Sequence, residues 1–547
     1  MKDTTNPMPP LRPPHEVMRL ARMGAMMPTR LSFLRVLTRR LCAERAVVRR
    51  THWDMCADGF GTSVHRVVLG GRDYALISVS KPLDDASRSD RVIATAWDAA
   101  FVLFDGVPTD ADIARVAAQA PRQEAGRFEP RDLVLSRANK SMRLWSEIVT
   151  ALRAGGQPSA SRIGEIGYVM RTTAVYGNGK FGIADRHLIE DRPELSGAFA
   201  AEMLAVYLIR QFSIDLVQHV GQGTLDRGLA RHIGVGNATG LGMAPFLVTH
   251  PVLLNNWMVA RETALARVLA VANIFPETRK RAARLGDRVA GHLSDWHVPS
   301  TPDEAALRAL EAEWGGFRLH FADLSARDPY AEVWALAQAG SVALQELVLA
   351  LLLELNGDIV DGLADCMIDP FGHPPRPFSG TEALRAAVIQ DWAWALEIDF
   401  DDSEACRRFW YVSADKLEPR LGDRFAEEGA ELETPLDIAR RVKNLFGDLP
   451  KIDQPVSAFL REFPDHKHAV DRVAICAHHP YSEIRDNLIA TTCRPIDMLR
   501  CKLSFFGATK FDPKSDLWTR ITLAQGAPLG DELNEERDDW WLPVMSA

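Results

Sequence analysis

The stretch IGVGNATGLGMAPFLVTHPVLLNNW, residues 233–257, decides between two kinds of fold for a chain of 547 residues. Its four glycines, Gly234, Gly236, Gly240 and Gly242, fall within nine residues and precede an apolar segment. So many glycines leave the backbone bare, so that either a phosphate can approach the amides or two buried helices can cross closely. The first use is typical of a nucleotide-binding α/β fold, and the second of a helical body.

The glycine spacing alone fits a dinucleotide site. Residues 236–242 read G-x-x-x-G-x-G, the spacing of short-chain dehydrogenases, in which a pyrophosphate approaches the backbone at a helix N-terminus. The surroundings do not fit, because LDRGLARHIGV (225–235) carries charges where a buried strand should lie. Pro245 and Pro251 also interrupt the segment where a helix should follow. We therefore expect no dinucleotide-binding domain.

Outside this stretch the apolar periodicity is mostly that of helices. Helical patterns cover residues 30–49, 199–220, 252–272, 304–313, 330–355, 382–396 and 435–446. Two β-rich runs flank Gly70-Gly71 within 61–79, which predicts a hairpin. Residues 472–478, 502–511 and 517–525 predict short strands. The predicted fold class is predominantly α-helical with minor β: a large multi-helix body, an N-terminal β-hairpin subdomain and short C-terminal strands.

Four parts are expected along the chain. They are a basic arm and helix (1–50), a small hairpin and helix subdomain (51–130), a helical main body (131–465) and a mixed α/β segment with an acidic tail (466–547). GHLSDWHVPS (291–300) and DPFGHPPRPFSGT (369–381) are interpreted as linkers, because proline and small polar residues break the helical pattern.

The net charge of −9 hides an asymmetry between the two ends. Residues 1–50 contain eleven Lys and Arg against three acidic residues, whereas 530–541 contain six acidic residues and one arginine. This pattern predicts a clasp within the chain or between subunits, or solvated faces. An anionic membrane surface is a rival partner for the basic end, and nucleic acid is disfavoured because the rest of the chain is acidic and no basic-aromatic module is present.

Cysteine usage and hydropathy bear on the compartment. Seven cysteines without any C-x-x-C pair favour reduced thiols in the cytoplasm. The longest strictly apolar run near the middle, 347–353, has seven residues, far fewer than the roughly 20 that span a bilayer. We therefore expect a cytoplasmic protein without a membrane span.

Polar residues gather around the glycines of the opening stretch. Bare amides near a helix start can bind an anion without a nucleotide-binding sheet. Alternatively, small residues allow a helix crossing and the polar residues cap helix ends. The candidate binding residues here are Gly236, Asn237, Thr239, Gly240, Gly242 and Asn255, with His250 as a candidate acid or base.

A second polar cluster lies in YVMRTTAVYGNGKFGIADRH, residues 168–187. Arg171, Lys180 and Arg186 could bind a carboxylate or phosphate, with Tyr176 as a proton donor. A surface hairpin around Asn178-Gly179 with ordinary charges is the alternative. The sequence leaves open whether this cluster and the glycine stretch share one pocket.

Two charged stripes interrupt otherwise apolar helices. Asp215 and His219 lie four residues apart, on one face, where the carboxylate could orient the imidazole. Glu346, Glu354 and Asp358 form the second stripe, which would handle protons or metal if buried; we expect it to be solvated. The histidines of 466–479 match no zinc signature, so we assign no metal site, and the sequence names no cofactor.

Two classes of function remain. The first is a cytoplasmic enzyme acting on a small anionic metabolite that carries a carboxylate or phosphate. It would hold the anion at 234–242 and at Arg171, Lys180 or Arg186, with acid–base chemistry from Tyr176, His219 or His250. The second is a non-catalytic assembly or regulatory protein, associating with copies of itself or a partner through its charged ends. We prefer the enzyme; the sequence indicates no reaction.

Overall fold

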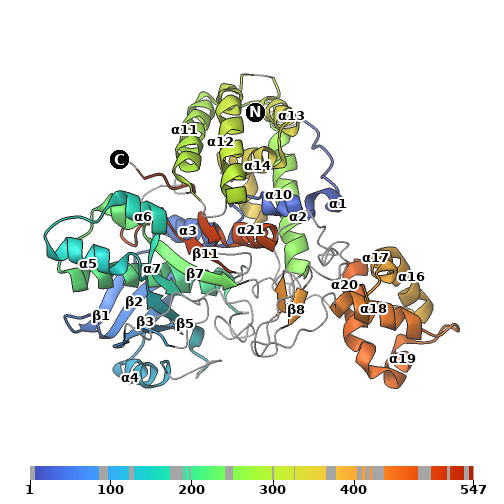
Figure 1. Ribbon diagram of the computed structural model, residues 1–547, viewed down its shortest axis with the longest axis horizontal. Helices are drawn as coiled ribbons and strands as arrows, with labels where there is room; N and C mark the ends of the chain where they lie inside the picture. The colour runs from blue at the N-terminus through green and yellow to red at the C-terminus, as the bar shows by residue number, and fades with distance from the viewer. Residues whose placement is uncertain are drawn as a thin grey trace.

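The computed structural model shows a broad sheet, a helical body packed against it and a smaller helical module beside that body (Figure 1). The residues that it describes are 6–84, 96–121, 129–172, 189, 191–195, 197, 199–240, 251–297, 301–325, 327–364, 377–402, 410–412, 419–421, 437–478, 495–513, 518–534 and 541–545. The interpreted linker at 369–381 lies mostly outside these residues.

The sheet has nine strands in the order β1-β2-β3-β4-β5-β6-β7-β11-β10. Every neighbouring pair is antiparallel except β6 and β7, which are parallel. The strands are β1 Arg49–Met55, β2 Gly61–Leu69, β3 Arg72–Ser80, β4 Ala99–Asp105, β5 Asp132–Lys140, β6 Tyr168–Thr172, β7 Gly234–Gly240, β10 Lys510–Pro513 and β11 Trp518–Leu523. The C-terminal strands thus complete the sheet that the N-terminal strands begin.

This sheet corrects the predicted fold class, because the protein is mixed α/β and its sheet is not a minor part. The hairpin at 61–79 is present as β2 and β3, with Gly70 and Gly71 at positive φ. Strands β4 to β7 come from sequence interpreted as helix or loop. Conversely, residues 472–478, predicted as a strand, lie in the helix Lys467–His478, and residues 502–506 of the predicted strand at 502–511 lie in the helix Pro495–Phe506. β4 is one continuous apolar run because its two faces enter different cores, Leu103 in one and Val102 in the other. Such a short run does not distinguish strand from helix by its period.

Helices cover both faces of the sheet. α7 (Ala200–Gly221) is apolar nearly all round and packs against the strands from β2 to β7, so it is the central core helix, as its sequence predicted. α4 (Asp110–Gln119) covers the opposite face with Ile113 and Val116. Around the sheet lie α5 (Trp145–Arg153), α6 (Ala160–Ile166), η3 (Pro193–Leu195) and α8 (Arg227–His232).

The helical body stands on the sheet edge that carries β10 and β11 (Figure 1). The sequence predicted one helix over 330–355, but Ser341 ends that run by capping a new helix, accepting a hydrogen bond from the Leu344 amide at 3.1 Å. The body contains α1 Pro14–Val17, α2 Leu20–Gly24, α3 Phe33–Ala43, α10 Pro251–Leu269, α11 Pro276–Asp295, α12 Thr301–Asp323, α13 Pro329–Gln338, α14 Val342–Leu355, α15 Gly357–Val360, η5 Asp361–Leu363 and α21 Pro495–Phe506. None of the described helices combines the length and apolarity that a membrane crossing requires.

A separate module packs around its own core, which includes Leu384, Trp392, Val442 and Phe459. Its elements are α16 Thr381–Asp391, α17 Ala393–Glu397, α18 Asp437–Asp448, α19 Val456–Glu462, η7 Pro464–His466 and α20 Lys467–His478, and the ribbon β8 Trp410–Val412 with β9 Pro419–Leu421 lies between it and the body (Figure 1). His466 stacks on Phe459 and donates to Asp448 at 2.8 Å. Among the described residues, no three His, Cys, Asp or Glu side chains gather as metal ligands.

The two glutamates of α14 are buried, which corrects the expectation that they are solvated, whereas Asp358, the third member of the predicted stripe, is exposed as expected. Glu346 is 0% exposed and accepts hydrogen bonds from Arg22 at 2.9 Å and Arg261 at 2.5 Å. Burial alone would raise the pKa of Glu346, but its arginine neighbours hold that pKa below the ordinary value. Glu354, also 0% exposed, accepts from Arg35 at 2.9 Å. We call the ion pairs around Glu346 and Glu354 the α14 junction, and it fixes the N-terminal arm to the body.

The acidic end of the chain has its own partners. Glu532 pairs with Arg231 at 2.5 Å and Arg227 at 2.7 Å. Burial would raise the pKa of Glu532, yet the hydrogen bonds from Arg231, the Leu529 amide and Arg227 lower it to about 2. In the part of the chain that the structure describes, arginines of the basic arm pair with α14, with Glu262 on α10 and with Asp361 after α15, and Asp531 and Glu532 of the acidic end pair with α8.

Candidate ligand-binding site

The described part of the glycine stretch, residues 234–240, is a strand and not a loop or a helix crossing. A Cβ on Gly236 would lie 2.7 Å from the Tyr168 ring, and one on Gly234 would lie 2.4 Å from the Leu523 carbonyl oxygen. The glycines therefore admit an aromatic ring and a neighbouring strand. Gly236, Asn237, Thr239 and Gly240 all lie on β7.

The register of β6 and β7 brings the two predicted clusters together at their described ends. Arg171 lies opposite Gly236, and Thr172 opposite Asn237, on parallel strands. Arg171 and Asn237 are both buried. The other predicted residues lie outside the described residues, namely Tyr176, Lys180, Arg186, Gly242 and His250, and Asn255 is placed only as a member of α10.

The expected Asp215–His219 pair does not form. The Asp215 carboxylate accepts a hydrogen bond from His65 of β2 at 3.1 Å. His219 instead donates to the Cys56 carbonyl at 2.8 Å, and its ring packs on Trp53. The spacing along α7 was read correctly, but the sheet below the helix supplies a nearer imidazole. His65 is fully buried between aromatic rings, which indicates a structural role.

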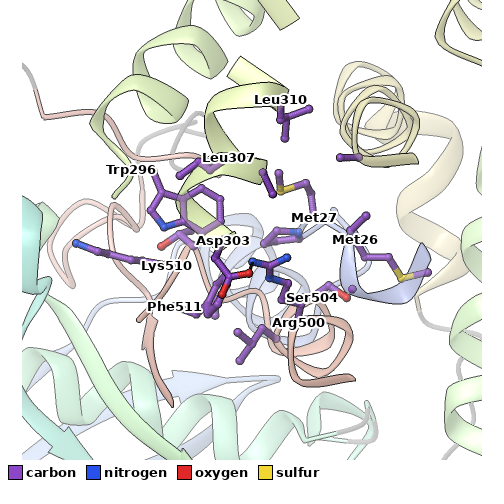
Figure 2. A pocket seen from close by; sticks show the side chains of 18 of the residues that line it. Met26, Met27, Trp296, Asp303, Leu307, Leu310, Arg500, Ser504, Lys510 and Phe511 are labelled. Atoms are coloured by element: carbon purple, nitrogen blue, oxygen red, sulfur yellow. Dashed lines mark hydrogen bonds and ion pairs between the residues drawn. The ribbon is translucent and has the colours of Figure 1, made fainter. Parts of the chain in front are cut away.

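A cavity of about 150 Å³ lies where the two ends of the chain meet the helical body (Figure 2). Its walls are the turn after α2, the facing ends of α11 and α12, α21, and the segment that leads into β10. Its apolar lining includes Met26, Met27, Leu307, Leu310, Leu503, Phe511 and Leu542, and its polar lining His292, Trp296, Asp303, Asp497, Arg500, Ser504, Thr509 and Lys510.

Helical spacing explains how two of these walls arise. On α12, Asp303, Leu307 and Leu310 recur at intervals of four and three residues, so they project from one face. On α21, Arg500 and Ser504 are four residues apart and face the same space. Figure 2 shows Asp303 and Arg500 meeting between the two helices, with Leu307 and Leu310 above them.

The charged groups in the cavity are already engaged. Arg500 donates to Asp303 at 2.9 Å, lies 3.9 Å from Asp497, and stacks over the Phe511 ring at 5.0 Å. Lys510 donates to the carbonyls of Gly164 and Glu165 near the end of α6. The cavity therefore offers two carboxylates and two cations that compensate one another.

Apart from the paired guanidinium of Arg500, three residues that line the cavity each have a buried polar atom with no hydrogen-bond partner within the described chain: His292 Nε2, Trp296 Nε1 and Thr509 Oγ1. A buried polar atom left unpaired costs about 1–3 kcal/mol, so such atoms in a folded protein call for an explanation. An indole N–H can only donate, whereas a hydroxyl can donate or accept. Such atoms occur elsewhere in the described chain as well, but here they belong to residues that also border open volume, where a small molecule or water can supply the missing hydrogen bonds.

The geometry fixes the role of His292. Its Nδ1 lies 3.1 Å from the Pro543 carbonyl oxygen, which can only accept, so Nδ1 carries the hydrogen and Nε2 is an acceptor. Burial lowers the pKa of His292 to about 4; the Pro543 carbonyl opposes this shift, and Arg288 and Lys510 add to it. The imidazole is therefore neutral at pH 7.

A second cavity of about 40 Å³ adjoins the first. His292, Trp296 and Lys510 line both, so they form the wall between the two spaces. The second cavity is otherwise lined by Gly164, His232, Asp295, Gln525, Pro543 and Met545. This volume is enough for a water molecule or a small substituent of a ligand.

Sequence reasoning missed this site, although one signal was present. His292 and Trp296 fall in the stretch interpreted as a linker, yet 291–295 belongs to α11. Leu285, Val289, His292 and Trp296 recur at helical spacing and continue its apolar face. Comparison of this chain with protein-family models, curated proteins and solved structures finds no match.

Proposed function

We propose that the protein binds a small uncharged molecule, about the size of one ring and carrying a hydroxyl or N–H group, in the cavity beside His292. The observation that carries this proposal is a partly open cavity of about 150 Å³ whose lining includes His292, Trp296 and Thr509, each with a buried polar atom that has no partner within the described chain. Cavities of about that volume take up one benzene ring. A donor on the ring would satisfy His292 Nε2, and an acceptor on it would satisfy Trp296 Nε1.

Charge compensation argues for an uncharged ligand. An anion would have to compete for Arg500 with Asp303, which already accepts a hydrogen bond from the guanidinium at 2.9 Å. It would also meet Asp497, and like charges brought together in a poorly solvated space repel strongly. A cation would lose its hydration without gaining a free carboxylate. Burying the apolar surface of a ring against the apolar lining would instead be favourable.

The pKa of His292 favours recognition over proton transfer. A general base works best when its pKa lies near the working pH, and an imidazole with a pKa of about 4 is a weak base at pH 7. The same neutral ring is a good hydrogen-bond acceptor. His292 therefore positions the ligand, and the site as described assigns no reaction to it. We place this function in the cytoplasm, because the seven cysteines of the sequence include no C-x-x-C pair and favour reduced thiols.

Titration calorimetry with phenol, benzene and benzoate tests the proposal. We expect phenol to bind more tightly than benzene by roughly 2- to 10-fold, the effect of one hydrogen bond, and benzoate not to bind. His292→Leu should abolish the preference for phenol, and Leu307→Trp, which fills the cavity, should abolish binding. His320→Leu, at an exposed position of α12, is the matched control. Wild-type protein that binds none of the three, or binds benzoate best, would overturn the proposal.

An anionic metabolite remains the second candidate, at a different place. One observation favours it: Arg171 lies near the carboxyl end of β6, and the parallel register brings it beside Asn237 at the middle of β7. Ligands of α/β sheets commonly bind beyond the carboxyl ends of parallel strands. Arg171→Lys keeps the charge but loses the planar fork that holds an oxyanion in two places. Loss of inorganic phosphate binding in Arg171→Lys would support this candidate, and the absence of phosphate binding to the wild-type chain would remove it.

A further inference from the structure

The last described residues, 541–545, lie across the ligand-binding site, and we call them the C-terminal strap. Trp541 is 1% exposed, donates to the Pro28 carbonyl, and has Arg35 over its ring at 5.7 Å. Beyond this anchor the strap forms part of both cavities. Leu542 lines the larger one, and Pro543 and Met545 line the smaller.

Three consecutive carbonyls of the strap accept hydrogen bonds from side chains. Arg288 donates to Leu542 at 2.7 Å, His292 to Pro543 at 3.1 Å, and His232 to Val544 at 2.8 Å. Arg288 and His292 are four residues apart on α11, so the strap runs along one face of that helix. The strap pairs with no strand of the described sheet; these side-chain bonds and the packing of Trp541, Leu542 and Met545 against the main core hold it. A segment without sheet or helix hydrogen bonds of its own can open locally without unfolding the elements beneath it.

Two glycines make room for the strap. A Cβ on Gly291 would lie 3.2 Å from Val544 Cγ1, and a Cβ on Gly164 would lie 3.1 Å from Met545 Cγ. A larger residue at either position would therefore push the strap outward without removing any side chain that lines the larger cavity. Gly291 lies on α11 directly before His292. The same part of α11 therefore leaves space for the strap and carries His292, whose Nε2 is the proposed hydrogen-bond acceptor.

We propose that the C-terminal strap is the gate of the ligand-binding site and the element that orients its acceptor. When the strap is seated, Leu542 and Pro543 close the two cavities and the Pro543 carbonyl holds the hydrogen of His292 on Nδ1, which presents Nε2 to the ligand. When the strap lifts, the wall opens and His292 loses this restraint. The inference rests on the proposed binding function, which it extends from recognition to ligand entry and release.

Gly291→Leu is the test variant, because it lifts the strap and keeps His292, Arg288 and the lining of the larger cavity. Gly316→Leu on α12 is the matched control, since no atom lies within 4 Å of its Cβ. We expect 4-fluorophenol to dissociate at least about tenfold faster from Gly291→Leu than from wild-type protein, measured by fluorine NMR line shapes. The control should keep the wild-type rate.

A second readout follows His292 itself. In protein with carbon-labelled histidine, the pKa of His292 should rise from about 4 toward its ordinary value of 6.5 in Gly291→Leu, because the ring becomes exposed. Wild-type protein that binds no phenol overturns the proposed function, while the histidine titration still decides whether the strap restrains His292. Wild-type dissociation rates together with an unchanged His292 titration in Gly291→Leu overturn the strap proposal alone.

Discussion

The α14 junction and the ligand-binding cavity both bury charged and polar groups where the N-terminal arm meets the helical body. At the junction, Glu346 is met by Arg22 and Arg261, and also lies 3.7 Å from Arg12. At the cavity, Arg500 pairs with Asp303 and lies 3.9 Å from Asp497, and all three residues adjoin open volume. None of the junction glutamates or their arginines lines either cavity.

Unpartnered atoms occur in both regions, so they do not separate them. Glu354 Oε2 at the junction has no hydrogen-bond partner within the described chain, just as His292 Nε2 has none at the cavity. The two regions differ because His292 lines an open cavity with a mostly apolar lining, whereas no residue of the α14 junction lines either cavity. A buried charge surrounded by opposite charges anchors a segment, whereas a polar atom beside an enclosed volume can recognise a molecule.

Removing the junction carboxylate should produce the largest effect. Glu346→Ala leaves several arginines buried without their partner and should cost about 3–5 kcal/mol of unfolding free energy, measured by chemical denaturation. Glu277→Ala, at an exposed ion pair on α11, should change stability by less than about 1 kcal/mol. If Glu346→Ala lowers the unfolding free energy by less than the Glu277→Ala control does, the junction does not anchor the arm.

Lowering the pH should reduce the free energy of unfolding, because the buried His292 resists protonation in the folded protein. Its folded pKa of about 4 lies below the unfolded value of about 6.5, so the unfolded chain takes up the proton first as the pH falls. Stability is therefore fully present above pH 6.5 and falls between about 6.5 and 4, by at most about 3 kcal/mol.

The groups near His292 are Arg288 and Asp295 on its own helix, Lys510 across the wall, and Asp303 on α12. Because carboxylates elsewhere also titrate, the quantity to compare is the pH dependence of wild-type protein minus that of His292→Leu. The difference should appear between pH 6.5 and 4. Parallel curves over that interval would show that His292 is not held neutral by burial.

Changing the charge balance of the cavity should change the class of ligand. Asp303→Asn removes the carboxylate that engages Arg500 and should let benzoate bind at least about tenfold more tightly than to wild-type protein, by calorimetry. Asp287→Asn, at an exposed ion pair on the neighbouring helix, should leave binding unchanged. Continued exclusion of benzoate by Asp303→Asn would mean that charge compensation does not select the ligand.

The sequence predicted the parts of the fold whose signal is local. The long apolar helix at 200–221 and the hairpin around Gly70-Gly71 are both present, because periodicity and turn residues specify them within a few residues. Strand β7 carried no such signal. It is rich in glycine, and it pairs with β11 nearly 280 residues later, so tertiary packing alone makes it a strand.

The cavity could not be predicted from local sequence patterns, because it too is formed by residues that are far apart in the sequence. It joins Met26, His292, Asp303, Arg500 and Leu542, which lie on separate segments from both halves of the chain. Each residue is ordinary in its own stretch, and only the packing of α2, α11, α12 and α21 gives them a common space. The predicted Asp215–His219 pair shows the converse, because correct spacing on one helix did not reveal the nearer His65 on the sheet.

A crystal structure of the protein grown with phenol tests the central claim most directly. We predict one phenol ring among Leu307, Leu310 and Phe511, with its oxygen within hydrogen-bond distance of His292 Nε2 and the strap seated over it. An empty cavity at saturating phenol, or a ring whose oxygen faces Arg500 and leaves His292 unpaired, would contradict the claim.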